Sequence, residues 1–115
     1  MTQRREWRLY VEDILDAIAR ARTYVAATDF ETFSADPQAS DAVLYNFAVV
    51  GEAVGLIPPE VRDNHPEVPW AKMRGMRNVV IHQYPDVDLR IVWDTVHQDL
   101  PPLEPLLPAL LSEPR

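Results

Sequence analysis

Apolar side chains recur every three or four residues in the first part of the chain, and charged side chains fall largely between them. From about Trp7 to Ala27 the apolar positions are Tyr10, Ile14, Ile18, Ala21 and Val25. This spacing places the apolar residues on one face of an α-helix. The segment is therefore predicted to be an amphipathic helix that buries this face.

A second helix is predicted to begin at Pro37. The Asp36 side chain can cap it, and a proline suits the first helical turn because the N–H that it lacks has no partner there. Its apolar face is formed by Val43, Phe47, Val50 and Val54. The pair Pro58-Pro59 should end the helix.

Two more helices are predicted beyond a proline-rich connector at residues 58–69, which has room for one short turn of helix. The third runs from about Trp70 to Tyr84 and stops at Pro85, since a proline disfavours helical backbone in the residue before it. Asp86 or Asp88 can cap the fourth. The apolar stripe of the fourth helix continues in register through Leu89, Val92, Val96, Leu100, Leu103, Leu107 and Leu110.

Four prolines interrupt this last stripe, namely Pro101, Pro102, Pro105 and Pro108. A proline inside a helix costs about 3 kcal/mol, so we expect a kink at Leu100-Pro101 and an irregular C-terminal arm from about residue 101. Only three glycines are present and alternating apolar residues are scarce, which disfavours strands. The predicted fold is all-α, with one domain over residues 1–115 built as an up-down bundle of four to five helices.

The composition agrees with a globular protein, because 47% of the residues are hydrophobic and 25% are charged. The absence of cysteine excludes disulfide bonds and thiolate metal sites, and it suits a reducing cytoplasm. No apolar run approaches the roughly 20 residues that cross a bilayer, and no apolar segment follows the basic start of the chain as it would in a signal peptide. We therefore expect a cytoplasmic protein without membrane contact.

The formal net charge of −7 argues against a protein that holds nucleic acid by its overall charge. Basic residues nonetheless gather in two places, at Arg4, Arg5 and Arg8 and again at Lys72, Arg74 and Arg77. Any contact with RNA would therefore have to be local. An acidic surface with one basic patch would also suit docking to a protein partner.

Polar side chains gather on one side of the third predicted helix. At a helical repeat of about 100° per residue, one broad sector contains Arg74, Arg77, Asn78, His82 and Tyr84. Met73, Met76, Val79 and Val80 point elsewhere. Ile81 falls inside the polar sector, which gives a mixed face of the kind that a dimer contact could cover.

These residue types are suited to cleaving RNA without a metal ion or other cofactor. Histidine accepts and donates protons near neutral pH, and the planar guanidinium of arginine matches phosphate oxygens. RNA brings its own nucleophile, the 2′-hydroxyl, so an enzyme needs a proton acceptor, a proton donor and a cation beside the phosphate. One histidine and one arginine from each of two chains would supply that set.

The pattern Arg77…His82-Gln83-Tyr84 resembles the Arg-x4-His-x-Tyr motif of HepT-like HEPN toxins. Further segments are similar to other landmarks of that family and come in the same order. They are Gly51-Glu52-Ala53, Pro66-Glu67-Val68-Pro69-Trp70, Met73-Arg74-Gly75-Met76-Arg77-Asn78, Val87-Asp88 and Asp99-Leu100-Pro101. The resemblance covers roughly Asp41 to Leu103.

The resemblance implies a dimer of four- or five-helix domains in which the two motif helices face each other. Proteins of this family are ribonuclease toxins of toxin–antitoxin pairs. A small MNT-type nucleotidyltransferase silences them by transferring AMP to the motif tyrosine, here Tyr84. On this basis Arg77 would stabilise charge on the phosphate and His82 would be the general acid and base, with Asn78 and Arg74 in support.

Some assignments stay open at this point. Glu52 is either a buried support for the Arg-His pair, beside Gly51 and Ala53 that permit close approach of helices, or a surface carboxylate. Tyr45 stands where the family often has arginine. Together with the net acidity it favours an alternative function, a HEPN module that cleaves nothing and docks to, or is modified by, a minimal nucleotidyltransferase. A purely structural dimer is a third hypothesis, and nucleotide binding in the same groove is also open.

The other histidines and the tryptophans take no part in the predicted site. His65 and His97 have no plausible ligands at the spacing of a metal site. Trp70 and Trp93 are expected to belong to the core. We assign none of the four a function.

Overall fold

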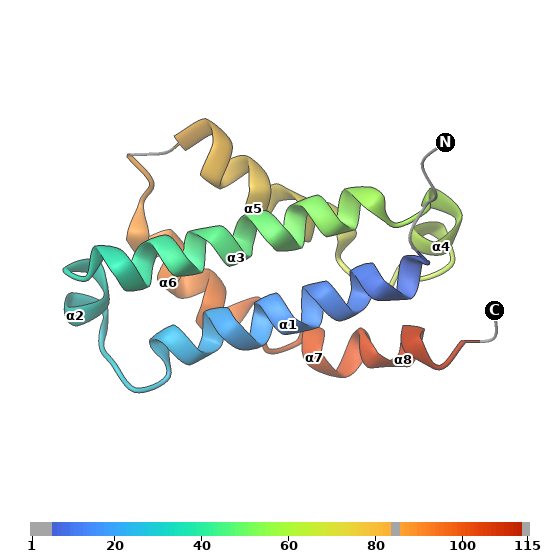
Figure 1. Cartoon of the computed structure of the whole chain (residues 1–115), viewed down its shortest axis with the longest axis horizontal. Coiled ribbons are helices and arrows are strands. Elements are labelled where there is room, and N and C mark those ends of the chain that lie inside the picture. Colours follow the sequence, from blue (N-terminus) through green and yellow to red (C-terminus); the bar gives the residue numbers. More distant parts are fainter. Residues whose placement is uncertain (1–5, 84–85, 114–115) are drawn as a thin grey trace.

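The computed structural model describes residues 6–83 and 86–113, with only the backbone for His82 and Gln83. That part of the chain contains eight helical segments and no strand (Figure 1). The segments are α1 (Trp7–Val25), α2 (Phe30–Ser34), α3 (Pro37–Leu56), α4 (Pro59–Asp63), α5 (Trp70–Gln83), α6 (Leu89–Gln98), α7 (Leu103–Leu106) and α8 (Pro108–Leu111).

The four longest segments, α1, α3, α5 and α6, are the four helices that the sequence pattern predicts. The all-α class is confirmed, although the number of segments exceeds the expected four to five. The connector after α3 forms the expected turn of helix, α4. The pattern missed α2, which is only five residues long. A helix of that length is too short to display a repeat, and its one local signal is the cap Asp29, whose side chain accepts a hydrogen bond from the Thr32 amide at 2.8 Å.

Aspartate residues cap the N-termini of α3 and α6, the two helices for which such caps were predicted. The Asp36 carboxylate accepts hydrogen bonds from the amides of Gln38 and Ala39 at the start of α3, at 3.1 and 3.3 Å. At the start of α6 the choice between Asp86 and Asp88 is decided for Asp88, which accepts from the Arg90 amide at 2.9 Å. Each cap satisfies amides that have no partner within the helix.

The C-terminal arm is not irregular as expected, because its prolines divide it into two short helices. Pro108 is the first residue of α8, where a missing N–H costs no helical hydrogen bond. The apolar stripe therefore survives the breaks, and Leu103, Leu107 and Leu110 are at most 2% exposed. Burial of a leucine side chain is worth about 1.5–3 kcal/mol, which is enough to hold these short segments on the bundle.

Helix α3 lies between α1 and α5 and packs extensively against both (Figure 1). Ile14 and Ile18 of α1 and Phe47 and Val54 of α3 belong to one hydrophobic core, and all four are at most 3% exposed. Helix α8 contacts α1, so that α1 is covered on two sides. Trp70, at 9% exposure, belongs to the core as expected, and Trp93 packs at its edge.

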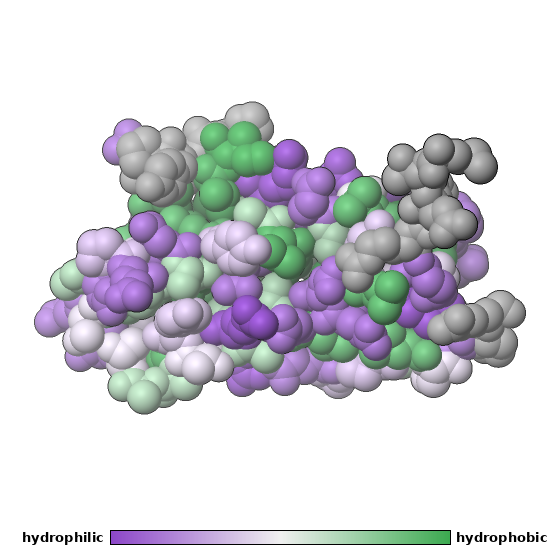
Figure 2. Space-filling view, viewed as in Figure 1, coloured by the Kyte–Doolittle hydropathy of each residue, from purple (hydrophilic) through white to green (hydrophobic). Residues whose placement is uncertain are grey.

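The C-terminal end of α5 projects from the bundle (Figure 1). Ile81 near this end is 50% exposed, and Figure 2 shows hydrophobic atoms gathered over the projecting end beside the atoms drawn in grey. In the part of the chain that the structure describes, no helix is both long enough and apolar enough to span a membrane. The end of α5 that carries the His82 backbone thus stands out from the core, whereas Met73 and Met76 earlier in the same helix are buried.

Candidate active site

Two glycines of α3 decide where α5 crosses it. A Cβ added to Gly51 would lie 2.4 Å from Arg77 Cβ and 2.8 Å from the Arg77 backbone nitrogen, closer than real Cβ contacts. A Cβ added to Gly55, one turn later, would lie 2.5 Å from Arg74 Nη1. The prediction that Gly51 permits close approach of helices agrees with these distances, and the partner is the helix that carries the motif.

Arg77 reaches across α3 at Gly51 and pairs with Glu52. The distance from Arg77 Nε to Glu52 Oε2 is 2.8 Å, and the two side chains are 43% and 60% exposed. Of the two alternatives left open for Glu52, the buried support is thus wrong, because this side of α3 faces solvent. Glu52 is instead a surface carboxylate that holds the guanidinium. An exposed pair of this kind is worth about 0–1 kcal/mol, so it orients Arg77 without fixing it.

The guanidinium of Arg77 belongs to a groove of about 350 Å³ between α1 and α3. Its walls are Tyr10 and Asp13 of α1, Ala48, Val49, Glu52, Ala53 and Leu56 of α3, and Arg77 itself. The groove combines an apolar floor with one cation and two carboxylates. Sequence reasoning missed Tyr10 and Asp13, because they lie on the first helix. Their only signal is their spacing of three residues at the edge of the apolar stripe.

Arg74 and Asn78 are both exposed. The Arg74 guanidinium lies over the bare backbone of Gly55, one helical turn before Arg77. The Asn78 side chain makes no hydrogen bond to Arg77 or to any other described residue. The structure thus brings Arg77, Arg74 and Glu52 to the same side of α3, whereas Asn78 is turned to solvent.

His82 and Tyr84 complete the predicted motif. The backbone of His82 is helical and belongs to the last turn of α5, and its side chain is outside the description. Tyr84 lies outside the described residues altogether. The proximity of His82 to Arg77 therefore stays a prediction from the helical repeat.

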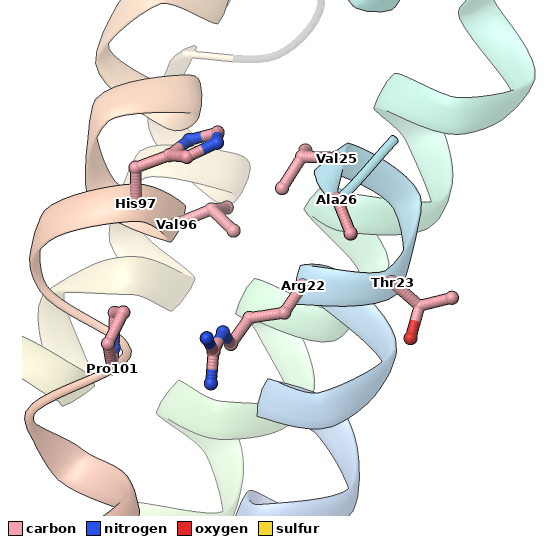
Figure 3. Close-up of a pocket in the computed structure, with 7 residues that line it drawn as sticks. All are labelled: Arg22, Thr23, Val25, Ala26, Val96, His97 and Pro101. Carbon is pink, nitrogen blue, oxygen red and sulfur yellow. The ribbon is translucent and has the colours of Figure 1, made fainter. Parts of the chain in front are cut away.

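A second hollow of about 330 Å³ lies between the ends of α1 and α6 (Figure 3). Its polar side chains are already engaged. Arg22 forms an ion pair with Glu104, and His97 donates a hydrogen bond from Nδ1 to the Trp93 carbonyl at 2.8 Å. The His97 ring also packs on the Trp93 ring at 4.3 Å between centroids. These contacts account for His97 without a catalytic role.

His65 fastens the connector to the C-terminal arm. Its Nδ1 is 3.1 Å from Glu67 Oε2, and its Nε2 pairs with Glu113. Hydrogen bonds from the Glu67 backbone amide and then from His65 hold the pKa of the Glu67 carboxyl below its ordinary value. The two carboxylates bind opposite ring nitrogens and so do not converge. Among the described residues no cluster of three His, Cys, Asp or Glu side chains could hold a metal ion.

Comparison with known proteins adds independent information. A family model described as ribonuclease HepT-like matches residues 14–110. "Probable ribonuclease HepT" of Thermococcus cleftensis is 39% identical over 95 residues, which are 83% of this chain and 86% of that protein. A candidate RNase of Caldanaerobacter subterraneus subsp. tengcongensis is 36% identical over 106 residues, 92% of this chain and 95% of that protein. No solved structure matches the chain with statistical significance.

Proposed function

The chain belongs to the HepT-like ribonuclease family, and from this premise we propose that it is an endoribonuclease whose catalytic residues are Arg77 and His82. The observation that carries the proposal is the placement of Arg77. Its guanidinium lies at an open groove, is half exposed, and is held by one carboxylate contact that a phosphate could replace. The same helix carries His82 five residues later.

The proposed reaction needs no group from outside the protein and the RNA. One imidazole takes the proton of the 2′-hydroxyl, and the 2′-oxygen forms a bond to phosphorus. The bond from phosphorus to the 5′-oxygen breaks, and a protonated imidazole gives its proton to that oxygen. The products are a 2′,3′-cyclic phosphate and a free 5′-hydroxyl. Arg77 stabilises the negative charge on the phosphoryl oxygens, and Asn78, exposed on the same helix, orients the substrate.

We propose a homodimer as the active form, since two imidazoles serve this reaction better than one. The projecting end of α5 supports this, because Ile81 is 50% exposed beside the catalytic residues. An exposed isoleucine on a mixed face is the kind of side chain that a second copy would cover. Each copy would then bring one Arg77 and one His82 to a shared cleft.

Regulation by a nucleotidyltransferase extends the proposal. An MNT-type antitoxin would transfer AMP from ATP to the Tyr84 hydroxyl, with release of pyrophosphate. The added phosphate carries negative charge within reach of the motif helix, where it would compete with RNA for Arg77. In this role the protein is the toxin of a toxin–antitoxin pair.

The test compares the variants Arg77→Ala and His82→Ala with the wild type in cleavage of single-stranded RNA, with a chelator present. We expect both variants to lose cleavage by at least about a hundredfold while they stay folded and dimeric. Arg20→Ala is the matched control, because Arg20 also forms an exposed ion pair, with Asp16 at 3.0 Å on α1. Cleavage by His82→Ala at the wild-type rate would refute the proposal.

The second candidate is a HEPN module that docks to, or is modified by, a nucleotidyltransferase and cleaves nothing. The net charge of −7 and Tyr45, which is 68% exposed where a basic residue would help to bind RNA, favour it. Mass spectrometry after incubation with the nucleotidyltransferase and ATP separates the two functions. A gain of one or more AMP units at Tyr84, together with no RNase activity before modification, would select the second.

A further inference from the structure

The basic residues of α5 differ in how they are neutralised. Lys72 Nζ lies 3.2 Å from Asp99 Oδ1, and Arg77 pairs with Glu52. Arg74 is exposed, and within the described part of the chain it has neither a carboxylate partner nor a hydrogen bond. Helix α5 itself contains no acidic residue. Among the described side chains of this helix, Arg74 is therefore a cation that is ready to take an anion.

The Arg74 side chain is nonetheless held in place by Gly55. The position of a Cβ on Gly55 is 2.5 Å from Arg74 Nη1, 3.3 Å from Cζ and 3.6 Å from Nη2. The guanidinium thus occupies the space that any other residue at position 55 would fill. Gly55 belongs to the last turn of α3, and this turn contains no basic residue. The carbonyl end of a helix favours a nearby cation, and the Arg74 guanidinium takes that place. The unpaired charge is positioned before a ligand arrives.

We propose that Arg74 is a second phosphate-binding residue, which holds the RNA phosphate next to the one that is cleaved. Residues three apart on a helix have Cβ atoms about 5–6 Å apart, so a strand that lies along α5 meets Arg74 and Arg77 in succession. The inference rests on the proposed function and gives Arg74 a binding role, with no part in proton transfer. A contact of this kind fixes the register of the strand and reads no base.

The net charge makes such a contact important. A protein with a net charge of −7 gains little RNA affinity from its overall field, so a few local cations must supply it. Each phosphate contact to a single strand contributes about −0.7 to the slope of log affinity against log salt concentration. A single arginine can therefore be detected by the slope as well as by the affinity.

The experiment measures binding of a fluorescent 2′-O-methyl RNA of about a dozen nucleotides, which lacks the nucleophile and stays intact. We expect Arg74→Ala to weaken binding about tenfold and to flatten the salt slope by about 0.7. In cleavage assays its KM should rise more than its kcat falls. If Arg74 served only to stabilise the end of α3, Arg74→Ala would lower the Tm and leave affinity and slope unchanged, and that result would overturn the inference.

A pair of glycine variants tests the position of the charge separately from its presence. Gly55→Ala keeps Arg74 but displaces its guanidinium, which can move because it is the end of a flexible side chain. It should weaken RNA binding by about threefold to tenfold. Gly75→Ala is the matched control, since a Cβ there meets nothing within 4 Å, and its RNA binding should equal that of the wild type. Equal affinity for both variants would also overturn the inference.

The outcomes distinguish this inference from the proposed function. Loss of cleavage in Arg77→Ala and His82→Ala, with unchanged RNA affinity in Arg74→Ala, would leave the ribonuclease proposal standing and remove the second phosphate site. Wild-type cleavage in His82→Ala, with weakened RNA binding in Arg74→Ala, would remove the ribonuclease proposal and leave Arg74 as a phosphate-binding residue. Absence of any RNA binding by the folded wild-type protein would remove the second phosphate site outright.

Discussion

Replacement of Gly51 by alanine is expected to disturb the crossing of α3 and α5 more than the same replacement at Gly55 or Gly75. The new Cβ would lie 2.4 Å from Arg77 Cβ, 2.8 Å from the Arg77 nitrogen and 3.0 Å from the Arg74 carbonyl oxygen. Two of these atoms belong to the backbone and the third is attached to it, so no side-chain rotation relieves the contact. Helix α5 has to shift away from α3.

The size of the effect follows from two opposing contributions. Overpacking of this kind costs about 1–3 kcal/mol, and the better helix propensity of alanine returns about 0.8–1 kcal/mol. The free energy of unfolding should therefore fall by up to about 2 kcal/mol, which lowers the Tm by up to roughly 8 °C. The shift also moves Arg77 relative to its substrate. Because a misplacement of about 1 Å can cost about a hundredfold in rate, RNA cleavage should fall about tenfold to a hundredfold.

Urea unfolding and thermal unfolding measure the first effect, and RNA cleavage under conditions where the variant is fully folded measures the second. Gly75→Ala provides the comparison, because it gains the same helix propensity at a position where nothing lies within 4 Å of the new Cβ. It should be more stable than the wild type by up to about 1 kcal/mol. The reasoning is refuted if Gly51→Ala is stabilised as much as Gly75→Ala.

Two further predictions concern the fold. Leu107→Ala should lower the free energy of unfolding by about 2–5 kcal/mol in urea unfolding, because Leu107 is fully buried in the C-terminal arm; a loss below about 1 kcal/mol would mean that the arm is not packed as described. A hydrogen bond from the Thr32 amide holds the pKa of the Asp29 carboxyl below its ordinary value. The cap of α2 therefore contributes its full stability above the unfolded-state pKa of about 3.9. This contribution is lost as the pH falls through the lower pKa of the folded state. Asp29→Asn should therefore lose less stability than the wild type between pH 5 and pH 2, roughly, and parallel pH profiles from urea unfolding would contradict this.

The long helices and their caps could be predicted because their signals are local. The apolar repeat of α1 and the pairing of Asp36 with Pro37 act within a few residues, and the structure follows them closely. The end of α1 at Val25, two residues before the predicted end at Ala27, is an error of the usual size at helix ends. The C-terminal arm was wrongly predicted because a proline was weighed only as a helix breaker. Pro108 instead begins a helix. A proline can take this position only where a new short helix starts, and one continuous helix would offer no such position.

The candidate site was predicted only in part. The helical repeat places Arg74 and Arg77 on a common sector of α5, and the resemblance to the HepT-like family selects that sector. The repeat also places Asn78 there, where its side chain is exposed, and its role stays a prediction. The roles of His82 and Tyr84 stay predictions, because the first is described only in its backbone and the second not at all.

By itself the sequence determined the four long helices, which of their faces are apolar, and which residues could carry acid–base chemistry. The tertiary structure alone decided that Arg77 crosses α3 at Gly51, that Glu52 is an exposed partner, and that the Arg74 guanidinium lies over Gly55. The physical reason is that a helical repeat fixes the direction of a side chain around its own axis. It fixes neither which helix lies opposite nor how closely, since that depends on the volumes of residues from distant parts of the chain.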